Sequence, residues 1–240
     1  MATWKNLDTL ETFKALSEVK RVKLAEVMSG AEGAERVKKY SVPMAEGFSY
    51  NFAAKQVDDE VLNALKALAA EAELSDKFAE LYNGAVINTG ENRLVLHHLT
   101  RGQLGDTVTA DGVDKRAFYV EQQQRIADFA NKVHSGEITN AAGEKFTTVV
   151  QIGIGGSDLG PRAMYLALEN WAKKNKTFKM EAKFISNVDP DDAAAVLASV
   201  DVAHSIFVLV SKSGTTLETL TNESFVKDAL AKAGLDASRH

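Results

Sequence analysis

The stretch TTVVQIGIGGSDLGP, residues 147–161, decides the fold of this 240-residue chain. It begins as a short β-branched apolar run, which is typical of a buried strand, and continues as a glycine-rich turn. Two similar runs follow, MEAKFISN at 180–187 and AHSIFVLVS at 203–211, and each of the three precedes a stretch with helical spacing. This alternation predicts an α/β fold with a parallel sheet flanked by helices.

The helices after these strands have readable start signals. Asp189 and Pro190 form a capping residue with a first-turn proline, while Thr215 and Glu218 have the spacing of a capping box. The helix after the glycine-rich turn is predicted to start around Pro161. A fourth strand would be expected after the last helix, so we expect an incomplete sheet and a piece of a longer protein.

The residues before the sheet have a different period. Apolar residues recur at helical spacing from Leu7 to about Gly136, most clearly in VDDEVLNALKALAAEAELSDKFAELYNG (57–84) and DKRAFYVEQQQRIADFANKVHSG (114–136). We therefore predict a mainly helical region over residues 1–140 and a truncated α/β domain over residues 141–240. The boundary between these two regions is marked by a change in the spacing of apolar residues and not by a linker.

Composition excludes several classes of function. The 33 acidic and 28 basic residues include no basic block that would follow a phosphate backbone, so we expect no nucleic-acid partner. No apolar stretch approaches the roughly 18 to 20 residues that cross a bilayer, so we expect no membrane partner. The absence of cysteine excludes disulfides, thiolate metal sites and thiol nucleophiles, and makes the cytoplasm the expected location.

Two loops that carry glycines and hydroxyls follow the first and third predicted strands. In the first, which starts at Gly153, Gly156 and Ser157 precede a helix; the second consists of Ser211, Lys212, Ser213, Gly214, Thr215 and Thr216. Hydroxyls and free amides at a positive helix end bind a phosphate dianion without a metal. Lys212 either adds charge or points into solvent.

Each loop alone is explained equally well as an ordinary turn that connects a strand to a helix, without a ligand. Both loops, however, fall at the carboxyl ends of parallel strands, where neighbouring loops close on one ligand. Two familiar phosphate motifs do not fit. A dinucleotide fingerprint starting at Gly153 would need glycine or alanine where Asp158 stands, and the Gly-Lys pair of a nucleoside-triphosphate loop does not occur. We expect no cofactor.

The segments QIGIGGSDLGP (151–161), SNVDP (186–190) and SKSGTTLET (211–219) resemble, in order and spacing, the sugar-isomerase segments of the glucose-6-phosphate isomerase family. INTGENRLVLHHLTR (87–101) resembles another segment of that family. The resemblance implies a flavodoxin-like three-layer sandwich. It also implies that Gly156 and Ser157 touch the sugar, and that residues 211–216 hold its phosphate.

The same resemblance implies an enzyme of glycolysis and gluconeogenesis that interconverts glucose 6-phosphate and fructose 6-phosphate through an enediolate, without a cofactor and as a homodimer. Its base, acid and cation are a glutamate, a histidine and a lysine in segments beyond residue 240. No residue here is therefore assigned a catalytic role, and we expect the 240-residue chain alone to be inactive.

Other polar residues receive structural interpretations. Arg93 and His97 are four residues apart, close enough to share a helix face, and are interpreted as packing residues. Adjacent histidines point in different directions, so no metal site is expected at His97 and His98. The remaining polar residues are interpreted as surface or terminal residues or as capping residues: His134, His204, Asp189, Asp191 and Asp192.

Two alternative functions stay open at this point. The same phosphate site without a base would suit a non-catalytic sugar-phosphate sensor, joined to a DNA-binding or second enzymatic domain. A different aldose–ketose isomerase is also compatible, because a phosphate site does not identify the sugar. The segment GENRLVLH (90–97) argues against this last alternative.

Overall fold

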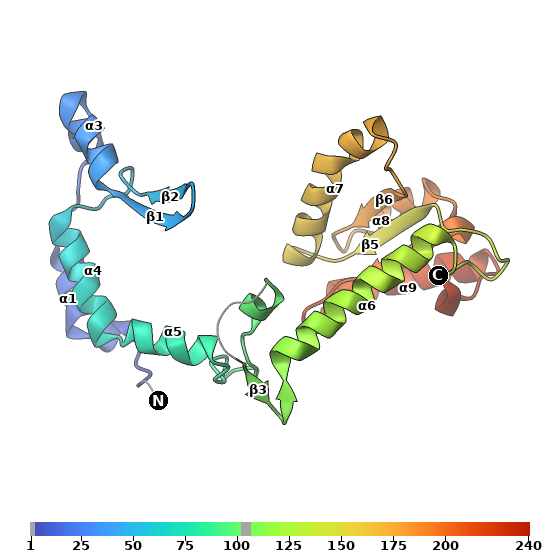
Figure 1. The fold of residues 1–240 in the computed structure, drawn as a ribbon, viewed down its shortest axis with the longest axis horizontal. Coiled ribbons are helices and arrows are strands. Elements are labelled where there is room, and N and C mark those ends of the chain that lie inside the picture. The colour runs from blue at the N-terminus through green and yellow to red at the C-terminus, as the bar shows by residue number, and fades with distance from the viewer. Residues whose placement is uncertain (1–2, 102–106) are drawn as a thin grey trace. The chain divides into compact units, whose positions relative to one another are not determined.

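The computed structural model describes residues 3–101 and 107–240. Contacts group the chain into two compact units, Met1–Val120 and Glu121–His240. The helix α6, Lys115–Ser135, begins in the first unit and runs through the start of the second (Figure 1). The two units thus divide between residues 120 and 121, whereas the change of period in the sequence lies near residue 140. In the described ranges, no helix is both long and apolar enough to cross a membrane.

The first unit is mainly helical but also contains two hairpins that the sequence analysis did not predict. Its helices are η1 (Leu7–Thr9), α1 (Glu11–Glu18), α2 (Leu24–Val27), α3 (Gly30–Lys39), α4 (Asp59–Glu71), α5 (Leu74–Tyr82) and η2 (His97–Thr100). The hairpins pair β1 (Ser41–Ala45) with β2 (Phe48–Asn51), and β3 (Thr109–Ala110) with β4 (Val113–Asp114), both antiparallel. The two hairpins thus interrupt the mainly helical region.

The segment 57–84, which reads as one helix, is two helices. The chain turns at Glu73, whose φ of 52° lies in the left-handed region, and α5 begins at the next residue. α4 begins at Asp59, and the preceding Asp58 caps it, because its side chain accepts a hydrogen bond from the amide of Val61 (2.9 Å).

A buried arginine organises the loop between the first hairpin and α4. The Arg36 guanidinium donates to the carbonyl oxygens of Ala53 (2.9 Å), Lys55 (3.1 Å) and Val57 (2.6 Å). It also lies over the ring of Tyr40, 4.5 Å from the centroid. The charge thus has hydrogen-bonding partners although the residue is buried.

The second unit contains the predicted parallel sheet, with strand order β6-β5-β7. Its elements are β5 (Thr148–Ile152), α7 (Gly156–Lys174), β6 (Glu181–Ile185), α8 (Pro190–Ala198), η3 (Val202–His204), β7 (Ser205–Leu209), α9 (Leu217–Lys232) and η4 (Ala237–Arg239). All three strands start and end in register, since β5 pairs residue by residue with β6 and with β7. The predicted α/β class is confirmed.

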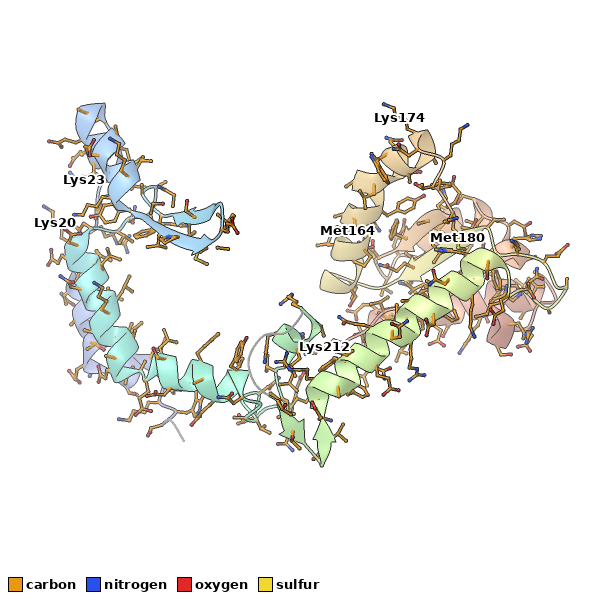
Figure 2. The ribbon with its side chains drawn as sticks, viewed as in Figure 1. Lys20, Lys23, Met164, Lys174, Met180 and Lys212 are labelled. Carbon is orange, nitrogen blue, oxygen red and sulfur yellow. The ribbon has the colours of Figure 1, made fainter. Side chains whose placement is uncertain are left out.

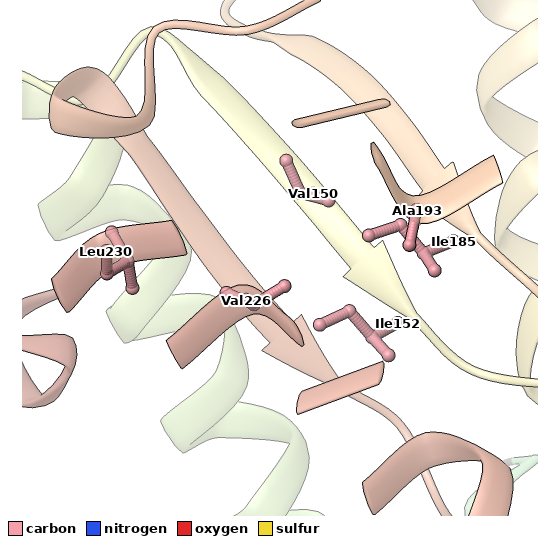
Figure 3. Close-up of a cluster of buried hydrophobic side chains, with 6 residues drawn as sticks. All are labelled: Val150, Ile152, Ile185, Ala193, Val226 and Leu230. Atoms are coloured by element: carbon pink, nitrogen blue, oxygen red, sulfur yellow. The ribbon is translucent and has the colours of Figure 1, made fainter. Parts of the chain in front are cut away.

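Helices cover both faces of this sheet (Figure 1). On one face, β5 and β6 pack against α8 and α9 to form the core drawn in Figure 3: Val150, Ile152, Ile185, Ala193, Val226 and Leu230. On the other face, Val149 lines grooves with α6 residues such as Phe129 and with Met164 of α7, which is labelled in Figure 2 with Met180. The arrangement is a three-layer sandwich.

A charged network lies at the amino ends of β5 and β7. His204 Nδ1 is 2.8 Å from a carboxylate oxygen of Asp201, and its Nε2 is 3.1 Å from a carboxylate oxygen of Glu144. Asn140 connects the same parts of the chain, because its Nδ2 donates to the Ala203 carbonyl (2.9 Å) and its Oδ1 accepts from the amide of Glu144 (2.9 Å). Both ring nitrogens of His204 therefore have a carboxylate partner.

The His204 network makes the stability of the second unit depend on pH. The hydrogen bond with Asp201 and the two negative charges raise the pKa of His204 above its ordinary value of 6.5. The stabilisation is fully present below that unfolded-state pKa, and it is lost as the pH rises through the higher folded-state pKa. We expect the difference in free energy of unfolding between wild type and His204→Gln to shrink from pH 5.5 to pH 8.5, measured by urea titration at each pH. A constant difference would contradict this linkage.

Candidate functional site

The two loops singled out in the sequence leave the sheet from neighbouring strands. Ile152, the last residue of β5, pairs with Leu209, the last residue of β7. The Val210 amide then donates to the Ile152 carbonyl (2.8 Å), so the strands stay joined up to the point where the loops begin. With strand order β6-β5-β7, the chain leaves β5 toward one side of the sheet and later crosses over to form β7 on the other side. In open parallel sheets, ligands bind beside such a reversal.

The first loop is shaped by two glycines. Gly155 precedes α7 with φ 57° and ψ −121°, a conformation that side chains rarely adopt. Gly153 is buried, and a Cβ added there would lie 3.1 Å from both the Cβ and the carbonyl oxygen of Ser157. Glycine at position 153 thus lets the loop fold back closely over Ser157.

The helix after this loop starts earlier than predicted. α7 begins at Gly156, so Pro161 lies inside the helix rather than in its first turn. The Ser157 amide donates to the Ile154 carbonyl (3.1 Å). Among residues 3–101 and 107–240, no acceptor is paired with the amides of Gly155 and Gly156. These two N–H groups lie at the positive end of a 19-residue helix, where an anion is stabilised.

Asp158, which stands where a dinucleotide fingerprint would need glycine or alanine, is buried. Its side chain is 5% exposed and accepts from Arg162 Nε (3.1 Å) and from Arg162 NH2 (3.0 Å). Arg162 in turn lies over the Phe184 ring, 4.9 Å from the centroid. The carboxylate at the start of α7 is thus paired with a cation, which limits its repulsion of an incoming anion.

The second loop holds itself together through its hydroxyls. The hydroxyls of Ser211 and Thr216 are 2.8 Å apart, and Ser211 Oγ also accepts from the Gly214 amide (3.1 Å). Ser213 Oγ accepts from both the amide and the hydroxyl of Thr215 (3.1 and 3.0 Å). Gly214 has a φ of 72° at the tip of this turn. Several donors are therefore gathered in one turn before a helix.

α9 begins at Leu217, with Thr216 as the preceding residue. The capping box predicted from Thr215 and Glu218 is wrong, because the Thr215 side chain bonds to Ser213 and Thr216 makes no side-chain cap bond. In the described part of the chain, the amides of Leu217 and Glu218 have no acceptor, as is usual in an uncapped first turn. They add further donors beside the loop.

The structure thus places all eight predicted residues at the carboxyl edge of the sheet. Gly156 and Ser157 lie in the first turn of α7, and residues 211–216 lie between β7 and α9. Lys212 has an exposed side chain and is labelled in Figure 2. Within the described ranges, no hydrogen bond joins Ser157 to the hydroxyls of the second loop.

Two supporting residues were missed in the sequence. The Gln151 side chain donates to the Ser157 carbonyl (2.9 Å). Asn222 is buried in α9 and donates to the Asn187 carbonyl (3.0 Å), which attaches the SNVDP loop to the helix after the second loop. Each is a polar residue in a run that otherwise faces the core, and that exception was the available signal.

The residues given structural interpretations belong to other segments of the chain. Asp189 caps α8 as predicted, accepting from the Asp191 amide (2.9 Å). Arg93 and His97 do not share a helix, because Arg93 forms a β-bridge with Asn88 and η2 starts only at His97. His98 stacks on Tyr82 with ring centroids 4.1 Å apart.

An open parallel α/β sheet with hydroxyl- and glycine-bearing loops at its reversal point defines a class of domains that bind anionic ligands. Comparisons with known proteins identify the family. A family model described as phosphoglucose isomerase matches residues 51–240. The chain belongs to that family, as the sequence motifs indicated.

Curated relatives named glucose-6-phosphate isomerase agree with this. The protein of Treponema denticola is 54% identical, over 98% of this chain and 45% of its own length. The protein of Borreliella burgdorferi strain B31 is 43% identical, over 98% of this chain and 44% of its own length. A crystal structure of a glucose-6-phosphate isomerase from Chlamydia trachomatis has a TM-score of 0.73 and 35% identity, over 98% of this chain and 44% of that one. The chain thus spans less than half the length of these relatives.

Proposed function

We propose that this chain is the amino-terminal, phosphate-binding part of an enzyme that interconverts glucose 6-phosphate and fructose 6-phosphate. One observation supports this above all. Two loops that carry hydroxyls and glycines leave adjacent, in-register strands, and each opens a long helix with amides at its start that have no acceptor among the described residues. Those are the groups that a phosphate dianion requires.

In this proposal the phosphate replaces bonds that the second loop makes with itself. The hydroxyls of Ser211 and Thr216 turn from each other to the phosphate oxygens, and the Gly214 amide, now bonded to Ser211 Oγ, becomes a donor to the ligand. The loop therefore exchanges hydrogen bonds instead of leaving groups unpaired, which keeps the cost of binding low. Gly156 and Ser157 contact the sugar from the first loop.

The proton chemistry is assigned to residues outside the two loops. Moving a proton between C1 and C2 needs a base near the substrate, and the Asp158 carboxylate is committed to Arg162. The family resemblance assigns base, acid and cation to segments that this chain does not match. The 240-residue chain alone is therefore expected to show no turnover in a coupled assay, and the full-length enzyme is expected to be a cytoplasmic homodimer.

Recognition of the phosphate group can be tested directly by calorimetry. We expect the chain to bind glucose 6-phosphate at least tenfold more tightly than glucose, because charge-assisted hydrogen bonds to phosphate contribute about 1.5–3 kcal/mol each. Inorganic phosphate, as a third ligand, separates the phosphate contribution from that of the sugar. Equal affinity for glucose and glucose 6-phosphate would overturn the proposed site.

A further inference from the structure

α7 contains a gap in its hydrogen bonding beside the first loop. Pro161 lies inside the helix and has no N–H group. In an α-helix the amide of residue 161 would donate to the carbonyl of residue 157, four residues earlier. Pro161 therefore leaves the Ser157 carbonyl without its normal helical donor, in the turn that is proposed to touch the sugar.

A side chain from the sheet supplies the missing donor. Gln151 Nε2 lies 2.9 Å from the Ser157 carbonyl oxygen. Gln151 is half-buried on β5, the central strand, where it pairs with Phe184 on one side and Val208 on the other. A donor on such a strand is held more rigidly than one on an exposed loop, since both neighbouring strands fix its backbone.

Ser157 is thereby held on several sides. Its amide donates to the Ile154 carbonyl (3.1 Å), its carbonyl accepts from Gln151, and Gly153 lies so close that any side chain there would meet it. Together these contacts set the peptide planes on both sides of Ser157, and with them the direction of the Cα–Cβ bond that carries its hydroxyl.

We propose that Gln151 is a positioning residue for Ser157: its amide replaces the helical donor that Pro161 lacks and so aims the Ser157 hydroxyl at the ligand. This inference rests on the proposed function, because it takes the hydroxyl to contact the sugar phosphate. Gln151 itself touches no substrate in this arrangement.

The pairing of Gln151 with Pro161 gives a test that a general structural role would not pass. Gln151→Met keeps the length of the side chain but removes the donor, and is expected to weaken binding of glucose 6-phosphate about tenfold, the effect of one lost buried hydrogen bond. Pro161→Ala restores an N–H at position 161. In the Pro161→Ala background, Gln151→Met is therefore expected to change the affinity less than about twofold.

The measurement is calorimetry of wild type, both single variants and the double variant, with thermal melts to confirm that each is folded. Gln124→Met is the matched control, because Gln124 also donates through Nε2, to Asp128 (2.8 Å), but on an exposed part of α6. It is expected to leave the affinity unchanged. In the full-length enzyme, Gln151→Met is expected to raise KM more than it lowers kcat.

The outcomes separate the two proposals. If wild type does not prefer glucose 6-phosphate to glucose, the proposed function fails and the positioning role fails with it. If wild type shows the preference but Gln151→Met binds equally well, only the positioning role is overturned. It is also overturned if the loss of affinity is the same with Pro161 and with alanine at position 161.

Discussion

Replacing Ser211 by alanine together with Thr216 by valine is expected to weaken binding of glucose 6-phosphate by about 100-fold, since two hydrogen bonds to a charged group are lost at about 1.5 kcal/mol each. The two hydroxyls are 2.8 Å apart, and Ser211 Oγ also holds the Gly214 amide. The double variant thus removes two donors and also releases the tip of the loop. Calorimetry with glucose 6-phosphate measures the loss.

Thr221→Val is the matched control for this loop. The Thr221 hydroxyl lies on α9, the helix that follows the loop, but it donates to the Leu217 carbonyl of that helix (2.9 Å) and not to the loop. It should leave the affinity within about twofold of wild type, since it is outside the set of proposed donors. The site assignment would be wrong if both variants lost affinity equally, or if the double variant bound normally.

Ile152→Ala is expected to lower the free energy of unfolding of the second unit by about 3 kcal/mol, the usual cost of a large-to-small change in a packed core. Ile152 is fully buried between the central strand and the helices α8 and α9 (Figure 3). It is also the last residue of β5, so the cavity would lie directly beneath the two loops. We expect weaker ligand binding to accompany the loss of stability.

The chain allows this loss to be measured in one unit. It has two tryptophans, Trp4 in the first unit and Trp171 in the second. In a Trp4→Phe background, urea unfolding followed by fluorescence reports on Trp171 alone. The control is Leu166→Ala, because Leu166 is 59% exposed and its truncation should cost less than about 0.5 kcal/mol. Similar losses for the two variants would contradict the assignment of the core.

The positions of the three strands in the sequence were predictable because their signals are local. Short β-branched runs between glycine and polar turns mark β5, β6 and β7, and Asp189 before Pro190 marks the start of α8. Such signals depend on residues a few positions apart, and tertiary contacts reinforce them here. The same holds for α6, which ends just before Gly136 as its sequence indicates.

The wrong expectations arose where distant contacts override local rules. A proline normally marks a first turn, yet α7 starts at Gly156 and contains Pro161, and a glutamine on the sheet donates to the carbonyl that the missing N–H of Pro161 would otherwise reach. The hairpin β1–β2 shows alternation at Val42, Met44, Phe48 and Tyr50, but this short signal lies within a longer helical pattern. The break at Glu73 has only a weak local signal, since strong helix formers precede it and only Ser75 and Asp76, just after it, are weaker ones.

The candidate site divides in the same way. The loop residues were predictable, because glycines and hydroxyls are concentrated after two strands. The supports, Gln151 and Asn222, were not, since their partners Ser157 and Asn187 are set by how a strand and a helix are packed. Sequence therefore indicates which residues form the two loops better than it indicates which residues hold those loops in place.

The strand order β6-β5-β7 also means that the sheet is completed late during synthesis of this unit. β5 is made first but is flanked on both sides by strands that are made later, and its register with β7 extends to Leu209. Until the ribosome has released that residue, one edge of β5 has no partner strand. Unpaired strand edges make folding intermediates prone to aggregate. While residues 186 to 209 are being translated, the sheet of the second unit is therefore incomplete.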